Sequence, residues 1–200
     1  NTRWLSDWSS DVCSSDLLRK VLETQKDNYL IWERMIMISN DLLDFNSIYT
    51  DAGNAIELFP SQPVLYALKA VACLQLNKYE EAIDILKEGE TYLLDNKPLR
   101  IQFDLYKAEA NYKLDRVEEA FKAFDAVISL DPENWLAMNN YAYYLSLRNE
   151  NLEKAEQLSG KAVKANPVNP TYLDTYAWVL FMRKEYTLAK FYMETAIKNG

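Results

Sequence analysis

The sequence predicts an all-α fold, a right-handed α-solenoid of stacked helix–turn–helix repeats. One four-residue segment recurs along the chain, as YEEA at 79–82, VEEA at 117–120, LEKA at 152–155 and YTLA at 186–189. The alanines that end these segments are 38, 35 and 34 residues apart. Prolines that end predicted helices follow in LFP at Pro60, LDP at Pro132 and ANP at Pro167. Self-similarity at a nearly fixed spacing indicates a repeat array, whose helix pairs bury a continuous core only when they are stacked.

The composition supports a helical chain and argues against two classes of function. The 200 residues contain only 4 glycines and 6 prolines, few for an all-β protein, which needs many turns. The 30 acidic residues outnumber the 22 basic ones and give a net charge of -8, whereas nucleic-acid-binding domains are basic. No apolar run approaches the roughly 18 residues that a membrane span requires. We therefore expect neither nucleic-acid binding nor membrane insertion in this segment.

The sequence lacks the residues of common catalytic and metal sites. It contains no histidine, which excludes Ser-His-Asp and Cys-His catalysis and His-ligated metals. Cys13 and Cys73 stand far apart without a CxxC motif, so they indicate neither a zinc site nor a disulfide framework. Cys73 lies in the apolar run LKAVACLQL, which predicts a buried structural thiol. We expect no enzyme activity and no cofactor.

The elements of the array follow one another from residue 18. Residues 18–28 read as the end of a partial repeat, because LLRKVLETQKDN resembles the tail of a second helix. Repeats of two amphipathic helices are then predicted at 29–62, 63–100, 101–134, 135–169 and 170–200. The last is incomplete, because the chain stops after AIKNG, where a closing proline is expected. We therefore expect the array to be truncated there and its last helix to expose Leu188, Phe191, Tyr192, Ala196 and Ile197.

Small residues recur where paired helices must approach closely. They are Ala70, Ala108, Ala142 and Ala177 in the first helices, and Ala82, Ala120, Ala155 and Ala189 in the second helices. Close packing is also the expected reason for the isolated helical glycines Gly53, Gly89 and Gly160. Asp131-Pro132 and Asn169-Pro170 predict helix starts, since each joins a capping side chain to a proline whose missing N–H costs nothing there.

This pattern resembles the tetratricopeptide repeat, whose signature is W-x-x-L-G-x-x-Y, then A-x-x-x-F, then P. Trp32 stands at the tryptophan position, and Ala120, Phe124 and Pro132 supply the rest of the signature in a later repeat. The match is imperfect, because Ile48 replaces the usual alanine and the glycine position holds isoleucine or alanine. The late repeats also resemble those of bacterial multi-repeat proteins of the cell envelope.

The resemblance implies a concave groove, lined by the first helices, in which a protein or peptide partner binds. The groove positions that it indicates are Glu109, Tyr112, Asn139, Asn140, Tyr143, Asp174 and Trp178. Only Asn140 matches the Lys, Asn and Arg set with which one subfamily holds acidic C-terminal tails, so that ligand is disfavoured. For Tyr143 and Trp178 an alternative stays open, namely packing between successive repeats.

The first 17 residues do not fit the array. The stretch DWSSDVCSSDL at 7–17 is the translation of DNA that resembles a common sequencing adapter. We interpret 1–17 as a non-native, disordered leader to be excluded from fold reasoning. The alternative is a genuine serine-rich leader, and resequencing the source gene across the junction distinguishes the two.

The leading functional prediction is a protein-interaction scaffold that binds a peptide or partner helix in its groove. Two alternatives from other classes remain. The array is the non-catalytic arm of a larger enzyme or envelope assembly, or it is a structural spacer. A catalytic module in the complete gene indicates the first, and failure of the intact protein to capture any partner indicates the second.

Overall fold

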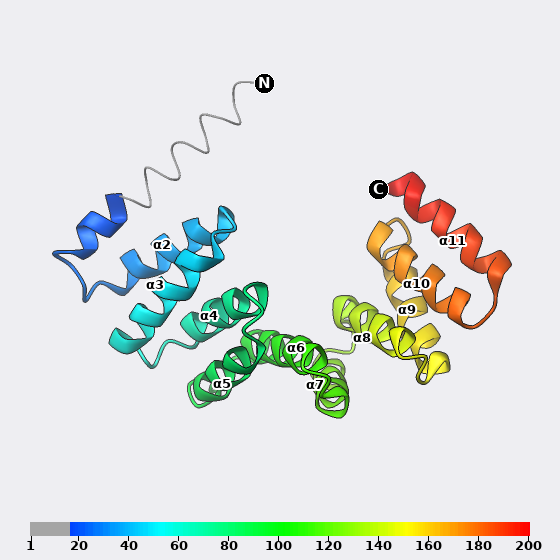
Figure 1. Ribbon diagram of the computed structural model, residues 1–200, viewed down its shortest axis with the longest axis horizontal. Helices are drawn as coiled ribbons and strands as arrows, with labels where there is room; N and C mark the ends of the chain where they lie inside the picture. The colour runs from blue at the N-terminus through cyan, green and yellow to red at the C-terminus, as the bar shows by residue number, and fades with distance from the viewer. Residues whose placement is uncertain (1–16) are drawn as a thin grey trace, which may run out of the picture. The chain divides into compact units, whose positions relative to one another are not determined.

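A computed structural model of the chain describes residues 17–200, so that the predicted leader, apart from Leu17, lies outside the described residues (Figure 1). Every regular element among the described residues is helical, and the predicted all-α fold is confirmed. The chain divides into two compact units, unit 1 (Asn1–Arg116) and unit 2 (Val117–Gly200).

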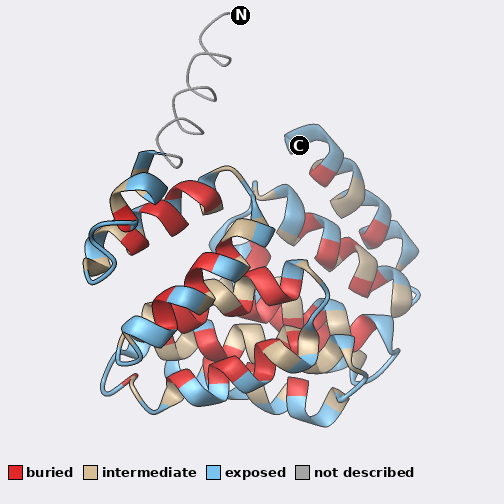
Figure 2. Cartoon of the chain, turned by 60° about the vertical axis from the view of Figure 1, so that its left-hand side comes forward, coloured by how far each residue is buried: buried red, intermediate tan, exposed pale blue. Residues whose placement is uncertain are grey.

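Each unit consists of consecutive helices that pack against one another. After a short helical segment at 17–22, unit 1 contains α2 (Tyr29–Asp41), α3 (Phe45–Leu58), α4 (Pro63–Gln75), α5 (Tyr79–Glu90) and α6 (Lys97–Lys113). Unit 2 contains α7 (Val117–Leu130), α8 (Trp135–Leu147), α9 (Leu152–Ala165), α10 (Pro170–Met182) and α11 (Tyr186–Asn199). Figure 2 shows buried and exposed residues interspersed along the helices.

Helix α6 differs from the expected repeat pattern. It begins at Lys97, about one turn before the predicted repeat start at 101. The Asn96 side chain caps this earlier start, because it accepts a hydrogen bond from the Leu99 amide at 3.1 Å. The last residues of the predicted 63–100 repeat therefore belong to the start of α6. The boundary between the units falls after Arg116, between two helices that the sequence placed in one repeat.

The small residues of the repeat are buried as their role requires. Ala70, Ala108 and Ala142 are fully buried, and Ala177 is 1% exposed. Their counterparts in the second helices, from Ala82 to Ala189, are at most 6% exposed. Within each unit, their burial fits the expected close approach of the paired helices α4 and α5, α8 and α9, and α10 and α11. Trp32 is also buried, and its indole Nε1–H donates to the Lys26 carbonyl at 2.9 Å.

The turn inside each helix pair is closed by a residue with positive φ. At the end of α4, Asn77 has φ 59°, its N–H donates to the Leu74 carbonyl, and the Lys78 N–H donates to the Cys73 carbonyl at 2.8 Å. This is a Schellman arrangement, which usually carries glycine at the positive-φ position. Here that position holds Leu43 (φ 55°), Asn77, Asp115 (φ 58°), Asn149 (φ 54°) and Lys184 (φ 69°).

Replacing Leu43 by glycine should stabilise unit 1 by about 1 kcal/mol, because a left-handed conformation strains a leucine but not a glycine. The Leu43 side chain is 68% exposed and contributes little packing that the substitution would remove. Urea denaturation monitored by circular dichroism measures the change. Asn77→Gly is the matched control, with a smaller gain, since asparagine tolerates this conformation. Equal gains at both positions would contradict the strain argument.

Candidate functional site

The candidate surface of unit 2 lies on α8 and α10, which pack against each other and against α9. Each helix begins at an asparagine cap. The Asn134 side chain accepts from the Ala137 amide at 3.0 Å, and the Asn169 side chain accepts from the Tyr172 amide at 3.1 Å. The predicted Asn169-Pro170 start is confirmed. The Asp131-Pro132 prediction is wrong, because Asp131 instead accepts from the Asn134 side chain and the helix begins at Trp135.

On α8, the predicted site residues differ in exposure. Asn139 is only 3% exposed, and its Nδ2 donates weakly to the Asn140 Oδ1 at 3.4 Å. The Asn139 Oδ1 is buried without a hydrogen-bond partner. Tyr143 is 41% exposed, with its ring centroid 5.8 Å from that of Tyr144. By contrast, the neighbouring Tyr141 is buried in the core, at 3% exposed.

On α10, Asp174 is exposed and Trp178 is half-buried. The Trp178 ring stacks on Phe181 with centroids 5.7 Å apart and an interplanar angle of 21°. Its Nε1–H is buried and has no hydrogen-bond partner. Within the described part of unit 2, no hydrogen bond or ring contact joins Asn139 or Tyr143 to Asp174 or Trp178. The structure therefore places the four residues on neighbouring helices but brings Trp178 together with Phe181.

The two remaining predicted residues, Glu109 and Tyr112, lie on α6 in unit 1. Both are half-buried. Burial raises the pKa of the Glu109 carboxyl above its ordinary value, and the positive charge of Lys113 opposes this shift. A carboxylate that is costly to bury in its charged form favours a cationic or hydrogen-bond-donating group beside it.

Sequence reasoning missed an apolar pocket between α10 and α11. The pocket has a volume of about 370 Å³ and is lined by Ala177, Trp178, Phe181, Tyr186, Ala189, Lys190 and Met193. Phe181 is 50% and Tyr186 58% exposed, with ring centroids 5.5 Å apart. The sequence does contain a signal for the α11 wall of this pocket. The spacing of Tyr186, Met193 and Ile197 places all three on one helix face.

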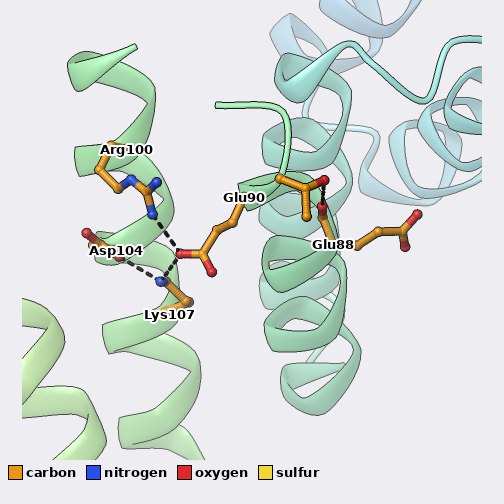
Figure 3. Close-up of polar contacts among 6 residues, drawn as sticks. Glu88, Glu90, Arg100, Asp104 and Lys107 are labelled. Atoms are coloured by element: carbon orange, nitrogen blue, oxygen red, sulfur yellow. Dashed lines mark hydrogen bonds and ion pairs between the residues drawn. The ribbon is translucent and has the colours of Figure 1, made fainter. Parts of the chain in front are cut away.

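A group of charged residues in unit 1 connects α5 to α6 (Figure 3). Lys107 Nζ lies 2.6 Å from Glu90 Oε1 and 2.7 Å from Asp104 Oδ1, and Arg100 lies 3.1 Å from the same Glu90 oxygen. Burial lowers the pKa of Lys107, but hydrogen bonds and charges from Asp104 and Glu90 outweigh it and raise the pKa overall. Satisfied ion pairs that join two helices indicate a structural role.

The structure also describes the other candidate groups that the sequence offers. Cys73 is fully buried, and burial raises the pKa of its thiol to about 11, which keeps it protonated and unreactive, as the sequence predicts. Residues 17–200 contain no group of three or more Cys, Asp or Glu side chains placed to hold a metal ion. None of the described helices combines the length and apolarity needed to cross a membrane.

Comparisons with known sequences place the repeats in one family. Family models described as Tetratricopeptide repeat match residues 64–91, 107–134 and 123–157. The chain is 36% identical over 91 residues to "Protein STIP1 homolog" of Dictyostelium discoideum, an alignment covering 46% of this chain. It is 26% identical over 135 residues, or 68% of this chain, to "TPR repeat-containing protein PA4667" of Pseudomonas aeruginosa. These alignments span only 15% and 22% of the relatives' lengths.

Solved structures share the fold at low sequence identity. The type IV pilus biogenesis factor PilW matches with a TM-score of 0.79 and 15% identity over 94% of this chain and 84% of that chain. A tetratricopeptide repeat protein from Parabacteroides merdae matches with a TM-score of 0.78 and 15% identity over 98% and 75%. YrrB, described as "a TPR protein with an unusual peptide-binding site", matches with a TM-score of 0.64 and 14% identity over 92% and 93%.

The predicted repeat spacing, the stacked helix pairs with buried alanines, the family matches and the similar folds all agree. The chain is a tetratricopeptide repeat protein.

Proposed function

We propose that this chain is a protein-interaction scaffold that binds a peptide or partner helix on the surface of α8 and α10. Tetratricopeptide repeat proteins generally act as non-catalytic interaction scaffolds, and YrrB is described as having a peptide-binding site. Exposed Tyr143 and Asp174, together with half-buried Trp178, supply the aromatic and acidic groups of the surface. Aromatic side chains offer large contact area and are enriched among residues that dominate binding energy.

The observation that carries this proposal is a pair of unpaired polar atoms, Asn139 Oδ1 and Trp178 Nε1. A buried acceptor or donor without a partner costs about 1–3 kcal/mol. A peptide group supplies both an N–H for Asn139 and a carbonyl for Trp178. Both atoms are covered in the free chain, so binding requires these side chains to turn toward the ligand. The proposed ligand is therefore recognised partly through its backbone.

The proposal is tested with a peptide selected from a phage-displayed random library on the full chain and titrated by fluorescence anisotropy. Tyr143→Ala should weaken binding at least about tenfold, because loss of an aromatic anchor costs about 2 kcal/mol. Its melting temperature should stay close to that of the wild type, because the ring is 41% exposed. Trp178→Ala should weaken binding to a similar degree.

Phe191→Ala is the matched control, since Phe191 is an exposed aromatic on α11 away from this surface. It should bind as the wild type does. If Trp178 instead serves packing between successive repeats, Trp178→Ala should lower stability, because truncating a core tryptophan costs about 3–5 kcal/mol. If both variants melt several degrees lower and bind normally once folded, Tyr143 and Trp178 serve packing and the proposal fails.

A further inference from the structure

The repeats of unit 2 can be compared with one another residue by residue. The buried alanines of α7 and α9 are 35 residues apart, and so are those of α8 and α10. The same offset pairs Tyr141 of α8 with Tyr176 of α10. Because equivalent residues take equivalent places in a repeat array, the surroundings of the two tyrosines show what differs between successive repeats.

At Tyr141 the polar groups satisfy one another. Lys154 Nζ of α9 donates to the Tyr141 hydroxyl at 2.9 Å and to Asp125 Oδ1 of α7 at 2.8 Å. The Tyr141 hydroxyl in turn donates to Asp125 Oδ2 at 3.4 Å. A carboxylate, an ammonium group and a hydroxyl from three helices therefore form one satisfied cluster.

At Tyr176 neither of these partners is present. Gly160 of α9 stands 35 residues after Asp125, and Leu188 of α11 stands 34 residues after Lys154, which is the spacing of the alanines in α9 and α11. Among the described residues, the Tyr176 hydroxyl has no hydrogen-bond partner, and its ring packs edge-on against Tyr192. The second tyrosine thus lacks both the carboxylate and the ammonium group of the first.

The geometry at Gly160 agrees with this correspondence. A Cβ atom at Gly160 would lie 3.7 Å from Tyr176 Cε2 and 3.9 Å from the Tyr176 hydroxyl oxygen. A side chain at this position would therefore point toward the hydroxyl, as Asp125 does toward Tyr141. Both distances are ordinary contacts, so the position has room for such a side chain.

The space beside Gly160 and Tyr176 belongs to a polar pocket, here called the Tyr176 pocket. Its volume is about 690 Å³, and its walls come from α9, from α10 and from Arg183 at the end of α10. It shares no residue with the apolar pocket beside Trp178. None of the predicted groove residues lines it.

The lysines of the Tyr176 pocket stand close to Gly160. Lys161 and Lys164 both line the pocket, one and four residues after the glycine. Neither ammonium group has an ion-pair partner among the described residues. The end of the pocket at Gly160 therefore offers two cations and one hydroxyl, the groups that bind a carboxylate most strongly.

The acidic residues of the pocket lie toward its other end. The Glu156 carboxylate is held by Arg183 at 2.8 Å. Glu153 stands seven residues before Gly160, which is roughly 10 Å along the helix. The place that corresponds to the Asp125 carboxylate is therefore flanked by lysines rather than by acids.

We propose that the Tyr176 pocket binds a carboxylate group, which takes the place that Asp125 occupies beside Tyr141 and is held by the Tyr176 hydroxyl and the ammonium groups of Lys161 and Lys164. The carboxylate comes either from an acidic side chain of a partner protein or from a small carboxylic acid. This site goes beyond the proposed peptide surface, whose Tyr143, Asp174 and Trp178 it does not use.

NMR titration of the full chain, following the Gly160 amide, tests the proposal. The first probe is the acetylated and amidated tripeptide Ala-Glu-Ala, for which we expect saturable binding with a dissociation constant on the order of 1 mM. The glutamine analogue should bind at least about tenfold more weakly, because it lacks the charge. Equal binding of both peptides, or no saturable shift with either probe acid, overturns the proposal.

Propionate is the second probe and distinguishes the two sources of the carboxylate. Binding of propionate as tight as that of the tripeptide supports a small acid as the ligand. Tighter binding of the tripeptide supports an acidic side chain of a partner. Tyr143→Ala should bind both probes as the wild type does, so this proposal and the proposed peptide surface fail independently.

Lysine variants then locate the site. Lys161→Ala combined with Lys164→Ala should weaken binding of the tripeptide about tenfold or more, because both charges beside the carboxylate are lost. Lys122→Ala combined with Lys198→Ala is the matched control, since it removes the same charge from residues outside the pocket. Equal effects of the two double variants overturn the proposed position of the carboxylate.

A carboxylate built into the chain provides a test that needs no ligand. Gly160→Asp should abolish binding of the tripeptide and melt about 2 °C or more above Gly160→Asn, because only the aspartate supplies a charge to the pocket. This difference should shrink when Tyr176→Phe is added to both variants. A difference that Tyr176→Phe leaves unchanged arises from the lysines alone and overturns the role of the hydroxyl.

Discussion

Replacing Gly89 by alanine should destabilise unit 1 by about 2–3 kcal/mol, although alanine is normally the better helix former. A Cβ atom at Gly89 would lie 2.6 Å from Tyr66 Cβ and 3.0 Å from a ring carbon of Phe103. Neither ring can move aside easily. Both are fully buried, and the Tyr66 hydroxyl also donates to the Pro60 carbonyl at 2.9 Å. Chemical denaturation monitored by circular dichroism measures the loss.

Gly53→Ala is the matched control for this prediction. A Cβ at Gly53 would meet only the flexible end of Lys69, with Nζ at 3.6 Å. The substitution should stabilise the chain by about 0.5–1 kcal/mol, the usual gain of alanine over glycine inside a helix. Opposite signs at the two glycines would show that Gly89 is required for contact between α5 and its neighbours. A gain at both positions would contradict that conclusion.

Replacing Lys107 by methionine should cost about 2 kcal/mol of stability. The substitution leaves Asp104, which is 8% exposed, without its only ion-pair partner among the described residues. Removing one partner from a fully buried pair costs about 3–5 kcal/mol. The expected loss is smaller here because the Lys107 and Glu90 side chains are 19% and 27% exposed. Urea denaturation at neutral pH measures it.

Two further variants separate charge from packing. Lys87→Met removes a lysine whose ion pair with Asp84 is 64% and 76% exposed, and it should change stability by no more than about 0.5 kcal/mol. Adding Asp104→Asn to Lys107→Met should recover part of the loss, because it removes the uncompensated charge. If the double variant is no more stable than Lys107→Met, the loss arises from side-chain packing.

The stabilising contribution of the Lys107 ion pairs should also depend on pH in a defined direction. The pKa of Lys107 is raised in the folded chain, so its stabilising effect is fully present below the ordinary lysine value of about 10.4. It is lost as the pH rises through the higher folded value. The stabilities of the wild type and Lys107→Met should therefore converge in strongly alkaline solution, and a constant difference would contradict the assignment.

The sequence by itself determined the class of this protein and its helix pairs. The recurring segments that end in Ala82, Ala120, Ala155 and Ala189 predict the second helices, and the structure begins those helices at the same segments. Such elements are predictable because helical periodicity and small residues at close contacts are local features of the chain. The buried thiol of Cys73 was predictable for the same reason, since its apolar neighbours are adjacent in sequence.

Only the tertiary structure decided which of several similar residues carry special roles. Gly53, Gly89 and Gly160 look alike in sequence, yet only Gly89 lies against buried rings, because Tyr66 and Phe103 come from other helices. The expectation of close packing is therefore correct for Gly89 and wrong for Gly53 and Gly160, whose nearest side-chain atoms lie at ordinary contact distances.

The candidate surfaces depend on the same kind of non-local information. The sequence predicted Asn139 as a groove residue, but its burial and its unpaired oxygen follow from neighbours on other elements. The pocket beside Trp178 requires α11 to pack against α10 at a defined register. Exposure, unpaired atoms and pockets are properties of the gaps between helices, and helical periodicity within one segment carries no information about what fills those gaps.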